Sequence, residues 1–226
     1  LSIAIVVAGA LIGRGLSQFR GADRTVSVRG VAEREVRADL GFWPIRFNAT
    51  DELLDRARQK VDADRRTVMR FLAKHGIDSA NVSIQGLEVQ DLQANAYQAN
   101  APRRFIINVT LIARSSEPEK IQRASQAMGD LVNAGVILQS GPYGGPSYAF
   151  TKLNDFKPAM VAEATASARL AAEEFAKQSK SGVGGLKRAS QGVFEILPRD
   201  QAQGIDEASQ IDKRLRVVTT LEYVLR

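Results

Sequence analysis

The hydrophobic and polar positions along the chain change their spacing several times. Three segments alternate between apolar and polar side chains: residues 25–36, 42–49 and 213–225. A period of two is typical of β-strands that bury one face. Three other segments, which begin near residues 52, 118 and 155, place apolar residues three or four positions apart. That spacing predicts three amphipathic helices.

Shorter apolar stretches complete the predicted order of elements. They predict strands over residues 82–89, 104–113, 136–138 and 191–197, and a short strand or packed loop at 148–150. The order is therefore ββαββ, αβ, αββ. Long antiparallel hairpins with few helices favour an α+β fold, with about three helices on one face of an antiparallel sheet or sheets. An N-terminal hydrophobic helix is expected to precede this fold.

Several local signals refine this prediction. Pro44 has no amide hydrogen, so its strand is expected to lie at an edge or to carry a bulge there. Gly86 stands where the alternation changes phase, which predicts a β-bulge. Residues 74–76, Lys-His-Gly, are a helix stop, and the strongly apolar segment 104–113 predicts a central strand. The third helix has a predicted buried stripe of Ala164, Ala168, Ala171, Ala172 and Phe175.

Residues 1–13, LSIAIVVAGALIG, carry no charge, and a basic sequence follows them abruptly. A transmembrane helix needs about 20 apolar residues, whereas the core of a signal peptide needs about 7–15. The sequence starts at Leu1 and not at Met, so we expect upstream residues that would extend the run. A leader cleaved after Ala10 and a buried core helix are the two other interpretations.

The preferred interpretation is a signal anchor over residues 1–20, followed by one domain over residues 21–226. The side chains expected to enter the membrane are Ile3, Ile5, Val6, Val7, Leu11 and Ile12. Either export interpretation puts the domain outside the cytoplasm, provided that the flank upstream is positively charged.

The amino-acid composition limits which ligands and partners the protein can bind. The chain carries 31 Lys and Arg against 25 Asp and Glu, a net charge of +6, and it has no cysteine. Disulfides and thiolate metal sites are therefore excluded. The basic residues are dispersed among acids, which favours a solvated surface over a nucleic-acid site. Aromatic residues make up only 6% of the chain, too few for an RNA-stacking platform, so we predict no nucleic-acid partner.

The sequence contains no recognisable catalytic or cofactor-binding motif. The single histidine, His75, is expected to cap carbonyl groups at a helix end, and it cannot form a zinc site of the usual kind alone. The glycine clusters at 141–145 and 182–185 lack the spacing of a phosphate-binding loop. We therefore predict no catalytic, metal-binding or cofactor-binding residue and no cofactor. A pair of acid and base carboxylates stays open, because two such groups can come together in any fold.

Five collinear segments are similar to one known family. They read VSVRGVAEREVRADL, GIDSANVSIQGLEV, FIINVTLIARSSEPEKIQRASQAMGDLVNAGV, EATASARLAAEEFAKQSKSGVGGLKRASQGVFEI and RLRVVTTLEYVL. Together they resemble the SIMPL-domain (DUF541) family of bacterial envelope proteins, over about residues 25–225. The resemblance implies an α+β domain, a periplasmic or envelope location, and, as in some members, self-assembly into ring- or channel-like homo-oligomers. With the signal anchor expected from residues 1–20, the domain would be periplasmic and held at the inner membrane. It also implies a link to oxidative stress, without a settled biochemical activity.

These observations lead to a non-catalytic, membrane-anchored assembly module as the preferred hypothesis. Its partners would be the membrane and further copies of itself, with no known small-molecule ligand. The alternatives are an envelope ligand-binding protein or enzyme with an unrecognised pocket, and a module that binds RNA or anionic lipid. The candidate interaction surface comprises Pro44, Tyr97, Arg103, Arg104, Tyr143 and Tyr148, with the loops 91–102, 141–150 and 198–212.

Overall fold

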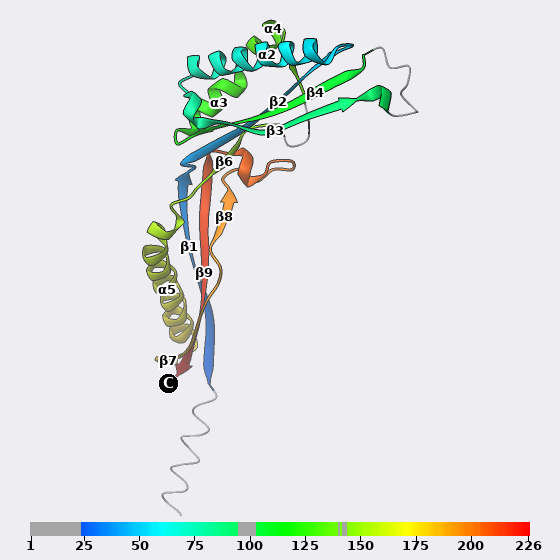
Figure 1. Cartoon of the computed structure of the whole chain (residues 1–226). Helices are drawn as coiled ribbons and strands as arrows, with labels where there is room; N and C mark the ends of the chain where they lie inside the picture. Colours follow the sequence, from blue (N-terminus) through cyan, green and yellow to red (C-terminus); the bar gives the residue numbers. More distant parts are fainter. Residues whose placement is uncertain (1–23, 95–102, 140, 142–143) are drawn as a thin grey trace, which may run out of the picture. The chain divides into compact units, whose positions relative to one another are not determined.

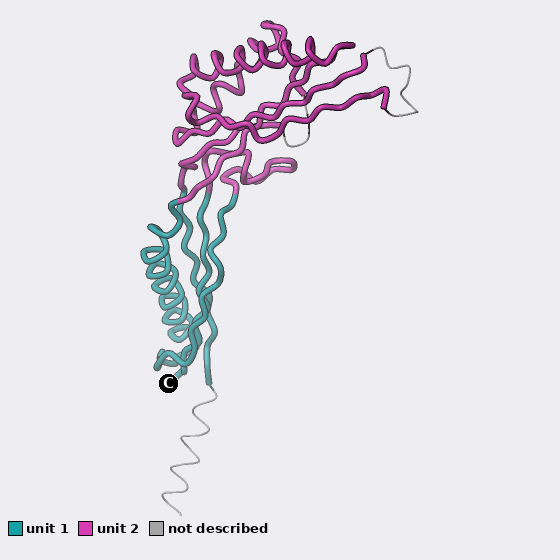
Figure 2. The backbone as a smooth tube through the Cα atoms, in the orientation of Figure 1, with its two compact units in different colours: residues 1–35, 152–197, 214–226 teal, residues 36–151, 198–213 magenta. Residues whose placement is uncertain are grey.

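The computed structural model describes residues 24–94, 103–139, 141 and 144–226, and these residues form two compact units. Unit 1 contains residues 24–35, 152–197 and 214–226, and unit 2 contains residues 36–151 and 198–213 (Figure 2). The predicted N-terminal anchor, including Ile3, Ile5, Val6, Val7, Leu11 and Ile12, lies outside the described residues. Among the described helices, none is both long and apolar enough to cross a membrane.

Unit 2 contains a five-stranded antiparallel sheet. Its strands follow the order β3 (Val82–Asp91), β4 (Phe105–Ser115), β2 (Leu40–Asp51) and β5 (Ile137–Leu138), and β6 (Ser147–Ala149) also pairs with β2. Strand β4 lies between β3 and β2 from Phe105 to Ala113, so the prediction of a central strand is confirmed. Only β3 and the two short strands remain at the margins of this sheet.

Three helices cover one face of this sheet (Figure 1). They are α2 (Leu54–Lys74), α3 (Pro118–Gln126) and α4 (Gly129–Asn133). The sequence pattern predicted one helix where α3 and α4 lie, and this was wrong. The α-helix is interrupted at Ala127 and Met128, because their amides donate to carbonyl groups three residues back, as in a 3-10 turn. Gly129, a poor helix former, follows.

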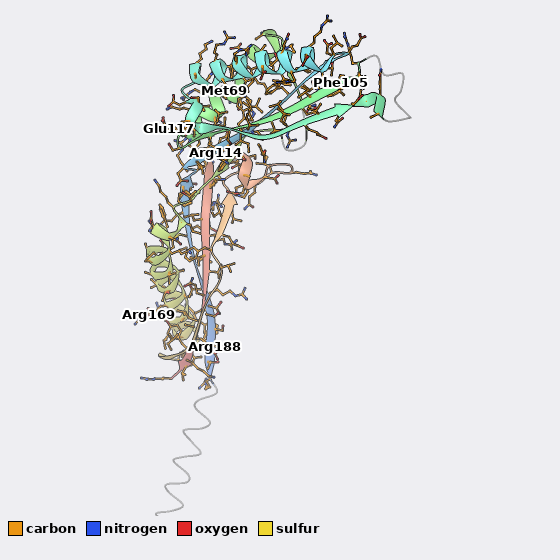
Figure 3. The ribbon with its side chains drawn as sticks, in the orientation of Figure 1. Met69, Phe105, Arg114, Glu117, Arg169 and Arg188 are labelled. Atoms are coloured by element: carbon orange, nitrogen blue, oxygen red, sulfur yellow. The ribbon has the colours of Figure 1, made fainter. Side chains whose placement is uncertain are left out.

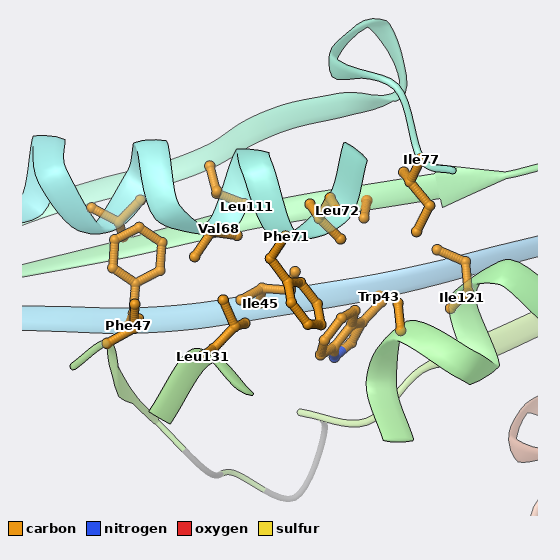
Figure 4. Packing of buried hydrophobic residues seen from close by; sticks show 14 of the residues in the cluster. Trp43, Ile45, Phe47, Val68, Phe71, Leu72, Ile77, Leu111, Ile121 and Leu131 are labelled. Carbon is orange, nitrogen blue, oxygen red and sulfur yellow. The ribbon is translucent and has the colours of Figure 1, made fainter. Parts of the chain in front are cut away.

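The core of unit 2 forms between these helices and the strands β2 and β4. Trp43, Ile45 and Phe47 are at most 2% exposed and point from one face of β2, as the alternation predicted (Figure 4). The ring of Phe71 on α2 meets Trp43 edge to face, with centroids 6.4 Å apart. Burial of each such side chain stabilises the unit by about 1.5–3 kcal/mol. The end of α2 is also as predicted: Gly76 has φ 75°, and the His75 ring contacts the Phe71 carbonyl at 2.9 Å.

Unit 1 contains a smaller antiparallel sheet and one long helix. The sheet consists of β7 (Val183–Gln191) and of most of β1 (Thr25–Arg37), β9 (Asp212–Leu225) and β8 (Glu195–Pro198), each of which has one or two end residues in unit 2. The helix is α5 (Leu153–Gln178). Strand β9 lies between β1 and β7, and β8 also pairs with β9. The helix buries Met160, Ala164, Ala168, Ala172 and Ala176. Ala171 and Phe175 were predicted in this stripe, but they are exposed, because the buried residues repeat every four positions.

The α+β fold is therefore confirmed, with two antiparallel sheets and four α-helices among the described residues. The helices are not gathered on one sheet, because α5 belongs to unit 1 and the other three belong to unit 2. Each unit has its own buried cluster, one around Trp43 and one around Ala168 and Leu221.

Candidate interaction surface

Strand β3 exposes apolar side chains at the margin of the unit 2 sheet. In the part of the chain that the structure describes, it pairs with β4 alone (Figure 1). Ile84, Leu87 and Val89 are 53%, 62% and 48% exposed. An edge strand presents unpaired backbone groups, and apolar side chains beside such an edge mark an interaction site.

A β-bulge places these side chains on one face. Ile84 pairs with Leu111 and Gly86 pairs with Thr110, so Gln85 is the extra residue on β3. Without it, Leu87 would point to the opposite face from Ile84, because side chains alternate along a strand. The bulge that was predicted at Gly86 is thus confirmed. Its effect is to align Ile84, Leu87 and Val89 with the core side of the sheet.

The exposed face of β3 borders α2, and two hollows lie along this boundary. The first, of 570 Å³, is lined by Arg65, Arg66, Met69, Arg70, Val82, Ser83, Ile84 and Leu111. The second, of 310 Å³, is lined by Leu54, Arg58, Val61, Asp62, Leu87, Val89 and Ile107. Met69, one of the α2 residues that line the first hollow, is labelled in Figure 3. We call these two hollows together the α2–β3 groove.

The α2–β3 groove is positively charged. Four arginines line it, Arg58, Arg65, Arg66 and Arg70, against one acid, Asp62. Arg65 pairs with Asp62 at 3.4 Å. Arg70 donates only to groups of its own helix, and among the described residues neither Arg58 nor Arg66 meets a carboxylate. The groove therefore combines an apolar floor with a basic rim, of which only Arg65 is paired with a carboxylate of the described chain.

The opposite margin of the same sheet differs in charge. Met128, Val132 and Ile137 are 43%, 57% and 56% exposed and line one hollow of 610 Å³ beside β5. The described residues of this lining, which include several glycines, carry no charge. We call Met128, Val132 and Ile137 the β5 patch.

Arg104, a residue of the predicted surface, joins the ends of β3 and β4. Its Nε and Nη2 donate to the two carboxylate oxygens of Asp91 at 3.1 and 2.8 Å. These hydrogen bonds hold the pKa of the Asp91 carboxyl below its ordinary value of 3.8. The guanidinium also lies 4.9 Å from the ring centre of Phe105. Arg103 is exposed next to it, whereas Tyr97 and Tyr143 fall outside the described residues.

Tyr148 does not belong to the surface, which corrects its place in the predicted set. It is 4% exposed and packs in the core of unit 2. Burial, and then the charge of Glu119, raises the pKa of Tyr148 above its ordinary value of 10.0. The isolated pattern around Tyr148 did not reveal that β6 pairs with β2 and turns this ring inward.

Pro44 is half-buried on β2, which is an inner strand of the sheet. On one side it stands opposite Ile112 of β4. On the other side β6 pairs as far as Phe42 and β5 begins at Phe47, so Pro44 falls between the two short strands. The missing amide hydrogen is tolerated at such a gap.

Among the described residues, no three of His, Cys, Asp and Glu come together in a way that could hold a metal ion. The sequence pattern alone did not predict the α2–β3 groove. The signal was the phase change at Gly86 combined with the arginine pair Arg65–Arg66 on the facing helix.

Comparison with known protein families identifies the family of this chain. The sequence profile of SIMPL, described as a protein of unknown function (DUF541), matches residues 26–218. The chain belongs to the SIMPL family. This match covers both units, from β1 to β9, and it confirms the resemblance drawn from the sequence. No curated protein matches the sequence of this SIMPL protein.

Proposed function

We propose that this SIMPL protein is a non-catalytic, membrane-anchored protein of the bacterial periplasm that assembles into homo-oligomers through the β5 patch. The observation that carries this proposal is the exposure of Met128, Val132 and Ile137 around one uncharged hollow. Contiguous exposed apolar side chains are typical of protein interfaces.

The absence of charge along the described lining of the β5 patch favours a second copy of the chain as partner. In a two-fold contact the same surface lies on both sides, so a surface that carries charge of one sign would face charge of the same sign. The β5 patch avoids that repulsion, whereas the arginines of the α2–β3 groove would create it. A two-fold contact alone yields a dimer, and the ring- or channel-like arrangement that the family resemblance implies needs a second contact.

The apolar N-terminal sequence supports the location. A run such as residues 1–13 suits export and anchoring, and the family resemblance adds the periplasm and a role in envelope or oxidative stress. Self-association would strengthen anchoring, because several leaders then bind the same membrane at a high effective concentration.

The native mass of the full chain in detergent tests this proposal. We expect a multiple of the chain mass by light scattering, and we expect the same multiple for a version that starts at Gly21. The variant Val132→Lys should lower the mass, because it adds one cation to each side of the contact. Its matched control is Leu170→Lys, in unit 1, since Leu170 is 66% exposed and lies outside the β5 patch.

A monomer mass for the full chain would refute the proposal. Loss of the multiple on removal of residues 1–20 alone would assign assembly to the leader and not to the β5 patch. An equal fall in native mass for Val132→Lys and Leu170→Lys would show that any added surface charge lowers the mass, and that the β5 patch is not the contact.

A further inference from the structure

The α2–β3 groove combines an open strand edge, two apolar hollows and a basic rim. We propose that it binds an extended, acidic peptide segment of another protein, which adds as a strand to the free edge of β3. This site is separate from the β5 patch and does not depend on self-association.

The backbone of β3 supplies the first requirement of such a site. The strand spans 10 residues, and in the described structure β4 is its only partner. Every second residue of β3 therefore directs its amide and carbonyl groups away from the sheet. An extended peptide satisfies these groups with main-chain hydrogen bonds, which supply affinity without sequence specificity.

The two hollows supply specificity. The first lies beside Val82–Ile84 and the second beside Leu87–Val89. On the regular strand β4, their centres correspond to Ile112 and Asn108, which are four positions apart. Four residues of a strand span about 13 Å and return the side chain to the same face. The peptide should therefore carry apolar side chains at positions i and i+4.

The positive charge of the groove favours acidic residues at the other positions of the peptide. Of the five charged residues that line it, only Asp62 is acidic. Arg58 and Arg66 are exposed and face no carboxylate within the described chain, so acidic residues of a bound peptide would compensate them. A second copy of this chain would instead bring the same arginines together, which is unfavourable. The two margins of one sheet thus suit different partners.

A fluorescent peptide of the length of β3 tests the proposal by anisotropy with the full chain in lipid nanodiscs. The probe carries leucines four positions apart and glutamates at the remaining positions. We expect saturable binding that weakens as salt is raised. A probe with glutamine for glutamate should bind at least about tenfold more weakly. A probe methylated on the amides that face β3 should lose binding, because it cannot add as a strand.

Variants of the protein separate the contributions. Arg66→Glu should weaken binding of the acidic probe at least about tenfold, and Arg66→Gln should have a smaller effect. The matched control is Arg188→Glu: Arg188 is exposed on β7 of unit 1 and is labelled in Figure 3. It should leave binding unchanged. Thermal unfolding of each variant checks that the fold persists.

Equal binding of the glutamate and glutamine probes, or full binding of the methylated probe, would overturn the proposal. A fall in native mass for Arg66→Glu would identify a second copy as the occupant and would overturn it as well. Competition by anionic lipid alone, with no binding of the probe in neutral nanodiscs, would assign the groove to the membrane. Because Val132→Lys tests self-association separately, failure of either proposal is recognised independently of the other.

Discussion

Gly30 of β1 determines how closely α5 lies on the sheet of unit 1. A Cβ atom at Gly30 would lie 1.9 Å from the carbonyl oxygen of Ala164 and 2.4 Å from the amide nitrogen of Ala168. Both are backbone atoms within a helix of 26 residues, so no side-chain rotation relieves the contact. We predict that Gly30→Ala forces α5 away from the sheet and destabilises unit 1.

The magnitude follows from the size of this clash. Contacts between non-bonded heavy atoms are favourable near 3.5–4.0 Å, so α5 must move by roughly 1.6–2.1 Å. Overpacking of this kind costs about 1–3 kcal/mol or more. Alanine also lowers the conformational entropy of the unfolded chain, which offsets about 0.4–1 kcal/mol of this loss of stability. Because both contacts are with backbone atoms, we expect a cost at the upper end of that range, a net loss of about 2–2.6 kcal/mol, and a fall in Tm of roughly 4–10 °C.

Two measurements test this prediction on the full chain. Denaturant unfolding followed by the helical circular-dichroism signal gives the loss of stability. Hydrogen exchange then locates it, since peptides from α5 should exchange faster while those from α2 keep their protection. The matched control is Gly185→Ala on β7, where a Cβ meets no atom within 4 Å.

A second substitution distinguishes backbone from side-chain overlap. The added methyl group would also lie 2.8 Å from the Cβ of Ala168, and Ala168→Gly removes only that contact. The double variant should therefore remain destabilised. Unchanged stability of Gly30→Ala, or a loss equal to that of Gly185→Ala, would refute the close approach of α5 to β1.

Two further predictions concern unit 2. The raised pKa of Tyr148 means that the folded state holds the phenol proton more tightly than the unfolded state. The contribution of Tyr148 to the free energy of unfolding is therefore fully present below about pH 10 and is lost as the pH rises further. Tyr148→Phe should remove this decline in unfolding measured from about pH 8 to about pH 12. The same decline in the wild type and in Tyr148→Phe would contradict the assignment. Lys213 is fully buried and donates to the Glu207 carbonyl at 2.6 Å, next to the Glu207 carboxylate. Glu207→Gln removes the negative charge beside the buried ammonium group and should lower the free energy of unfolding by about 1–3 kcal/mol in denaturant. Lys213→Met removes the buried cation as well and should lower it less. A larger loss for Lys213→Met would show that the charge pair does not stabilise this site.

Local patterns in the sequence determined most of the elements of this protein. The alternation of Trp43, Ile45 and Phe47 predicted β2 and its buried face, and the segment ending at Gly76 predicted the end of α2. The phase change at Gly86 predicted the bulge of β3. These features depend on residues only a few positions apart, so the sequence contains their whole physical cause.

Only the tertiary structure decided how these elements are partnered and what stays exposed. The division into two units depends on pairing between β1 and β9, which lie at opposite ends of the described chain. Leu87 has the same alternating pattern as a core residue, yet it is 62% exposed because α2 covers β4 and leaves the face of β3 uncovered. Tyr148, in a short polar segment, is buried because β6 pairs with β2. Burial depends on which distant segment lies opposite, and periodicity along the chain cannot specify that.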